Sequence, residues 1–182
     1  TVISNEVAGL YLMAFDLLEP WATHRKYQVF EDKHSSIFGK PWVNADRIVL
    51  CNVIVEAFRS LKSEIRHQLL AKYVLVDYFV LYIVRRIIDG SDLKELLINP
   101  KKFVRDDVQR AKVGQLFTSL LKEIIIDLNA EIDEEAEKTG GDFYYREKLR
   151  DQDWVRKIAA NVVNSYQKQI ARGRARGLNY MW

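Results

Sequence analysis

The sequence predicts an all-α domain, and three observations support this fold class. Apolar residues recur at intervals of three and four along most of the chain, the spacing that places them on one face of a helix. No segment alternates polar and apolar residues as a half-buried strand does. Only 8 glycines and 3 prolines interrupt the 182 residues, and most of them fall between the helical segments. We therefore expect a single bundle of about six to eight helices around one core.

Two helices are expected at the start of the chain. Apolar residues of segment 4–19 share a face, and Pro20 ends that helix because its ring is tolerated only in the first turn of a helix. The same proline suits the start of a second helix, over about 21–38, because its φ is fixed near the helical value. Trp21 and His24 are then expected to pack in the corner between the two helices. We interpret this stretch as a structural motif rather than a reactive site.

The next two segments are also apolar and helical. One runs from Asn44 to about residue 66, and its expected spine consists of Ile48, Val49, Val53, Phe58 and Leu61. Residues 69–88 are apolar on nearly every side, which predicts a helix buried at the centre of the bundle. This run includes Lys72 and Asp77, and charges at the centre of a bilayer are costly. We therefore expect a buried helix rather than a membrane span.

Capping signals predict two short helices after the central one. Asp92 and Glu95 match a capping box, in which each side chain satisfies a free backbone N–H of the first turn. The Asn99-Pro100 pair then supplies an N-cap and a first-turn proline for the next helix.

Two long helices complete the expected bundle. Apolar residues step at three and four through 107–137 and again through about 152–172. The predicted core residues are Val113, Leu116, Phe117, Leu120, Leu121, Ile124, Leu128 and Ile132 in the first, and Trp154, Ile158, Val162, Tyr166 and Ile170 in the second. We divide the chain into a helical domain, 1–172, and a basic, aromatic tail, 173–182.

Charge is segregated in the C-terminal part of the chain. From Glu123 to Glu137 there are seven acidic residues and no basic one, whereas from Arg146 onward nine basic residues oppose three acidic ones. The acidic run ends a helix at a Gly-Gly pair, so a solvated face explains it better than an acid–base pair. The basic region can hold phosphates, and its aromatic side chains can stack on bases. The candidate nucleic-acid contacts are Arg146, Arg150, Arg156, Lys157, Arg172, Arg174 and Arg176.

Sequence motifs of several enzyme classes are absent. No glycine-rich phosphate-binding loop and no H-E-x-x-H zinc motif occur. His24 and His34 would lie about 15 Å apart along one helix, too far to bind one metal ion. The single Cys51 excludes an internal disulfide, and with no secretory signal it indicates a reducing, cytoplasmic compartment. We expect no catalytic residue, no metal and no cofactor, and a hydrolase that uses His24 is the remaining enzymatic alternative.

A pattern near the N-terminus is similar to that of a known family. The segment NEVAGLYLMAFDLLEPWATHRKYQVFEDKHSSIFG, followed by NADRIVL, resembles a region in the later part of abortive-infection phage-resistance (AIPR) proteins. The matching residues are Asn5, Glu6, Ala8, Gly9, Ala14, Phe15, Glu19, Pro20, Trp21, His24, Lys26, Tyr27, Phe30, Ile37 and Phe38. The match lies within residues 5–50, and its pattern is one of packing rather than catalysis.

The resemblance implies that this chain is the helical C-terminal portion of a bacterial anti-phage defence protein. In that family the N-terminal part is the nuclease-like or effector region, and a start at Thr1 agrees with a fragment of a longer chain. The first hypothesis is a helical accessory domain for interaction, oligomerisation or regulation, whose partners are the remainder of the chain or its own copies. The alternative is a helical module that binds DNA or RNA through its basic C-terminal region. No membrane partner is expected.

Overall fold

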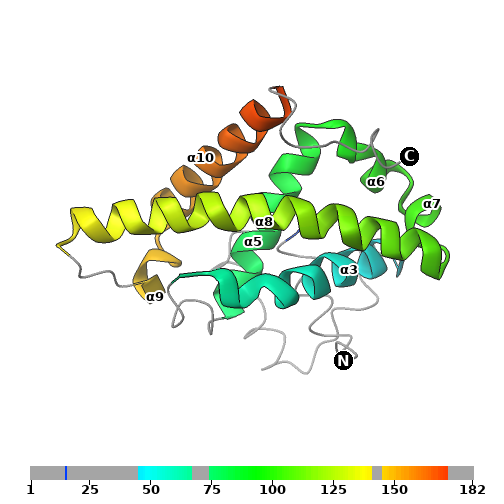
Figure 1. The fold of residues 1–182 in the computed structure, drawn as a ribbon, viewed down its shortest axis with the longest axis horizontal. Coiled ribbons are helices and arrows are strands. Elements are labelled where there is room, and N and C mark those ends of the chain that lie inside the picture. The colour runs from blue at the N-terminus through cyan, green and yellow to red at the C-terminus, as the bar shows by residue number, and fades with distance from the viewer. Residues whose placement is uncertain (1–14, 16–44, 67–73, 141–144, 172–182) are drawn as a thin grey trace, which may run out of the picture.

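Figure 1 shows the computed structural model of the chain, which describes residues 15, 45–66, 74–140 and 145–171. All regular elements in these residues are helical, and the predicted all-α fold class is confirmed for them. The α-helices are α3 Ala45–Leu61, α5 Val74–Asp89, α6 Glu95–Ile98, α7 Pro100–Val104, α8 Asp107–Lys138, α9 Tyr145–Lys148 and α10 Gln152–Ala171, and the 3₁₀ turns are η1 Lys62–Glu64 and η2 Asp92–Lys94. Apart from Phe15, the helices expected over 4–19 and 21–38 lie outside the described residues.

Helix α5 is buried on all sides, as the sequence predicts. Every residue from Leu75 to Val84 is buried, and α3, α10 and η2 pack against this helix. The run contains one charged residue, Asp77, whose carboxylate accepts a hydrogen bond from the Lys62 ammonium at 2.8 Å. Residues 69–73 of the expected helix lie outside the described residues. In the described part of the chain, no helix is both long enough and apolar enough to cross a membrane.

Helix α8 crosses the whole view in Figure 1, with α3 below it and α10 above it. Its 32 residues extend about 48 Å. The helix starts after Asp106, whose side chain accepts a hydrogen bond from the Gln109 backbone N–H at 2.8 Å. It ends before Gly140, whose φ of 69° favours glycine. All eight predicted core residues of α8 are buried.

Asn129 of α8 joins this helix to the end of η1. Its side-chain nitrogen donates to the Glu64 carbonyl at 3.0 Å, and its side-chain oxygen accepts from the Arg66 backbone N–H at 2.9 Å. The last carbonyls of a helix and the N–H groups that follow it have no intrahelical partner, and this buried amide satisfies one group of each kind. Beside it, Arg66 and Asp133 form an ion pair.

Helix α10 packs its predicted stripe against α5 and α8. Trp154, Ile158, Val162 and Tyr166 are buried, and the Trp154 ring lies 6.0 Å from the ring of Phe79 in α5. The stripe is therefore confirmed for these four residues. The side chain of Ile170 lies outside the described residues.

The α3 segment differs from the expectation at its end and on its face. The α-helix ends at Leu61 rather than near residue 66, because the chain tightens into the 3₁₀ turn η1. Phe58 and Leu61 are buried as predicted. Ile48, Val49 and Val53 are only half-buried, and Leu50, Cys51, Ile54 and Val55 are buried in their place.

The short elements also correct the sequence analysis. Ser91, not Asp92, caps η2: it has an extended backbone, and its hydroxyl accepts from the Leu93 N–H at 3.2 Å. Pro100 occupies the first position of α7 as predicted, but the Asn99 side chain makes no capping hydrogen bond. Helix α9 has no counterpart among the predicted helices.

We expect Ile124→Ala to lower the free energy of unfolding by about 2–5 kcal/mol, because its side chain is fully buried and its removal leaves a cavity. Ile126→Ala is the matched control two residues away, since Ile126 is 60% exposed. Its effect should stay within about 0.5 kcal/mol. Urea denaturation followed by circular dichroism measures both values. Equal losses in the two variants would contradict this assignment of the buried and exposed faces of α8.

Candidate functional site

The structure describes the side chains of three predicted nucleic-acid contacts. Arg150 follows α9 and is exposed, and Arg156 and Lys157 are exposed near the start of α10. Outside the description lie Pro20, Trp21, His24, Arg172, Arg174 and Arg176, together with the side chain of Arg146. For these residues the proposed roles remain predictions.

The exposed face of α10 is rich in cations and amides. Arg156, Lys157 and Lys168 are exposed, as are Asn164 and Gln167. No carboxylate follows Asp153 in this helix. The sequence signal of a basic C-terminal region therefore corresponds, in the described residues, to a solvent-accessible helix face that can contact phosphates.

The acidic end of α8 is partly solvated, and it also makes contacts with other elements. Four of its carboxylates have partners on other elements: three partners are on α9 and α10, which fold back alongside this part of α8, and one follows η1. The pairs are Glu135–Lys148 at 2.8 Å, Glu131–Asn161 at 3.3 Å, Asp127–Ser165 and Asp133–Arg66. At the Glu135–Lys148 pair, the acidic and basic blocks of the sequence meet within the fold.

The pKa values of two of these carboxylates are shifted in opposite directions. Burial raises the pKa of Asp127, and the hydrogen bond from Ser165 offsets only part of that effect. The hydrogen bond from Lys148 lowers the pKa of Glu135, although partial burial opposes it. Within the described residues, no group of three or more His, Cys, Asp or Glu side chains is placed to hold a metal ion.

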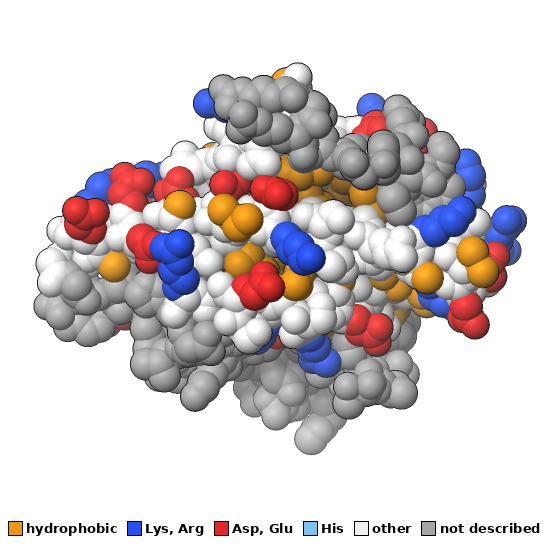
Figure 2. All heavy atoms as spheres, viewed as in Figure 1, with side chains coloured by type: hydrophobic (Ala, Val, Ile, Leu, Met, Phe, Trp, Pro, Cys, Tyr) orange, Lys and Arg blue, Asp and Glu red, His pale blue; other side chains and the backbone are white. Residues whose placement is uncertain are grey.

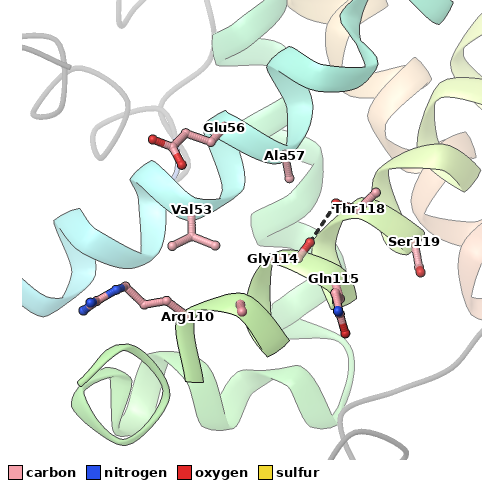
Figure 3. A pocket seen from close by; sticks show the side chains of 9 residues that line it. Val53, Glu56, Ala57, Arg110, Gly114, Gln115, Thr118 and Ser119 are labelled. Atoms are coloured by element: carbon pink, nitrogen blue, oxygen red, sulfur yellow. Dashed lines mark hydrogen bonds between the residues drawn. The ribbon is translucent and has the colours of Figure 1, made fainter. Parts of the chain in front are cut away.

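A groove of about 760 Å³ lies between α3 and α8 (Figure 3). Val53, Glu56 and Ala57 of α3 and Arg110, Ala111, Gly114, Gln115, Thr118 and Ser119 of α8 line it. Small side chains keep this hollow open: a Cβ added at Gly114 would still lie 3.9 Å from Val53 Cγ1. Thr118 turns its hydroxyl back to the Gly114 carbonyl at 2.8 Å, as the dashed line in Figure 3 shows. We call this feature the α3–α8 groove.

The outer side of α8 carries a stripe that continues the groove onto the surface. Val108 is 66% exposed and Ile126 is 60% exposed. Residues at three- and four-residue spacing form the stripe: Val108, Ala111, Gln115, Ser119, Lys122, Ile126 and Ala130, all of them exposed. We call this set the α8 stripe. Figure 2 shows hydrophobic side chains along α8 interspersed with uncharged and charged ones.

The sequence analysis does not predict this surface, although a signal for it is present. The stripe contains a single charged residue, Lys122, in a chain in which 29% of residues are charged. Ala111, Gln115 and Ser119 belong to both the stripe and the groove. The position of α3, which completes the groove, cannot be inferred from the spacing within α8.

No protein-family model, curated protein or solved structure matches the chain.

We expect Asp127→Asn to raise the free energy of unfolding at pH 7, because burial of the charged carboxylate opposes folding there. A raised folded-state pKa means that the native state binds the proton more tightly than the unfolded chain does. The penalty is therefore absent below the unfolded pKa and appears as the pH rises through the folded pKa. Urea unfolding at a series of pH values should show the two proteins converging in acid.

Glu135→Gln is expected to have the opposite effect. Because the folded-state pKa of Glu135 is lowered, its charge stabilises the fold above the unfolded pKa, and this contribution is lost as the pH falls through the folded pKa. The variant should be less stable than the wild type at pH 7 and equal to it in acid. If both substitutions changed stability at pH 7 with the same sign, the described environments of these carboxylates would be wrong.

Proposed function

We propose that this chain is a helical accessory domain of a bacterial phage-defence protein of the AIPR type, and that it acts through protein–protein contacts. The resemblance within residues 5–50 supports the family. The exposure of Val108 and Ile126 beside the α3–α8 groove is the observation that supports protein–protein contact. Exposed apolar side chains next to a concave surface are characteristic of protein interaction sites.

The one described residue of the resemblance before residue 45 also supports a packing role. Phe15 is fully buried, and its ring lies 5.5 Å from the guanidinium of Arg85. The Phe15 carbonyl accepts a hydrogen bond from the same guanidinium at 3.4 Å. An aromatic residue held in this way contributes to the core. This agrees with the interpretation that the resembling pattern within residues 5–50 determines packing rather than catalysis.

In cells protected by the full native protein, we expect Ser119→Arg to reduce protection against phage on the order of tenfold or more. The added side chain would fill the groove and place a charge on the α8 stripe, and about 1.4 kcal/mol of lost binding corresponds to tenfold. Asn99→Arg is the matched control, because it adds the same side chain at an exposed position that belongs neither to the groove nor to the basic face of α10. Efficiency of plating measures protection. Full protection by a folded Ser119→Arg variant would refute the proposed role of this surface.

The basic face of α10 supports a second candidate function, the binding of nucleic acid. Arg156, Lys157 and Lys168 present cations on a face without carboxylates after Asp153. Contacts between such cations and phosphates release counterions, so the affinity falls steeply as salt rises.

We expect the triple variant Arg156→Gln, Lys157→Gln and Lys168→Gln to bind single-stranded DNA or RNA with a flatter salt dependence. Each lost phosphate contact should reduce the log–log slope by about 0.7 for a single strand. Fluorescence anisotropy over a series of salt concentrations measures this slope. The control variant replaces the exposed Lys101, Lys102 and Arg105 by Gln, which changes the net charge equally near α7. Wild-type protein without salt-sensitive binding would eliminate this candidate.

A further inference from the structure

Charge is divided along the α8 stripe in a way that bears on its partner. In its first half, Lys112 and Lys122 lie on or beside the stripe. In its second half Glu123, Asp133 and Glu137 lie on or beside the stripe, and α8 has no basic residue between Glu123 and Glu137. Asp133 is paired with Arg66, which follows η1. At 100° per residue, all five of these α8 side chains lie within about 80° of the centre line of the stripe. The outer side of α8 is therefore basic toward the start and acidic toward the end.

We propose that the α8 stripe binds a second copy of this chain, with the two α8 helices antiparallel about a two-fold axis. This inference rests on the proposed protein-contact function and names its partner. Antiparallel packing places the basic half of one helix on the acidic half of the other. Because of the two-fold symmetry, this favourable contact occurs twice. A parallel arrangement would place like charges together. The surface is thus complementary to itself in one orientation only.

The shape of the surface is complementary in the same arrangement. When Lys122 of one copy lies opposite Glu123 of the other, Ile126 lies opposite Ser119 and Ala130 lies opposite Gln115. Ser119 and Gln115 line the α3–α8 groove, and the lining also includes the small residues Ala57, Ala111 and Gly114. The large exposed side chain of Ile126 in each copy therefore enters the hollow beside Ser119 of the other. This contact removes from water one of the most exposed apolar side chains of the described chain.

The extent of the surface predicts a weak dimer. From residue 108 to 137 the helix extends roughly 45 Å, and a strip about 10–12 Å wide buries on the order of 500 Å² per copy. A total near 1,000 Å² is at the lower end of specific protein interfaces. Dissociation in the micromolar range or weaker is expected, with affinity that falls as salt screens the paired charges.

Analytical ultracentrifugation of the full chain, with two charge-reversed variants, tests the proposal. One variant carries Lys112→Glu and Lys122→Glu, and the other carries Glu123→Lys and Glu137→Lys. Each alone should dissociate at least about tenfold more readily than the wild type, because like charges then face each other. An equimolar mixture should restore the dimer, since opposite charges face each other again. The mixture tests whether these charges on the two α8 stripes pair with each other, and circular dichroism verifies that each variant is folded.

Ile126→Lys provides an independent test if a charge-reversed pair fails to fold, because this position is exposed and tolerates change. It should also dissociate the dimer. The inference is overturned if the wild type is monomeric at hundreds of micromolar, if the folded variants dimerise as the wild type does, or if mixing restores nothing. If the wild-type chain is monomeric but Ser119→Arg still abolishes phage protection, the proposed protein-contact function stands and its partner is a different protein. Full protection together with a monomeric chain would overturn both.

Discussion

The burial of α5 on all its sides is the constraint on which the rest of the described fold depends. A helix without a polar face must be covered by the apolar faces of its neighbours, and α3, α10 and η2 supply them. Its one buried charge, Asp77, needs a cation, which Lys62 provides from η1. The same ammonium lies 5.9 Å from the centre of the Phe58 ring in α3. The tight turn after α3 thus places the group that makes the burial of α5 possible.

Helix α8 has a different role, because only part of its circumference is needed for the core. Its inner side closes the bundle, and its acidic end is held by contacts such as Glu135–Lys148 and Glu131–Asn161. Its outer side retains apolar side chains that the described fold does not cover. The segregation of charge along the sequence therefore contributes both to contacts within the chain and to the character of the surface that α8 presents.

Much of the described fold could be predicted from the sequence, and the exceptions have physical causes. Helices α8 and α10 have clear apolar stripes, and uniform apolarity identified α5. The segment of α3 is apolar on several sides, so the spacing of its apolar residues predicted neither which face is buried nor that the helix ends at Leu61. Ser91 and Asp92 are adjacent capping candidates, and the extended backbone at Ser91 decides between them. The groove and the Asp127–Ser165 contact join elements distant in sequence, so local patterns carry no information about them.

The Asn129 side chain makes one backbone amide unusually informative. The Arg66 N–H lies beyond η1, so its hydrogen bond to Asn129 is made across the tertiary structure rather than within a helix. Exchange of this amide hydrogen with solvent deuterium requires α8 to separate from the end of η1, whereas helical amides also exchange by local fraying. Protection at this single position therefore reports the docking of α8 onto the preceding half of the bundle.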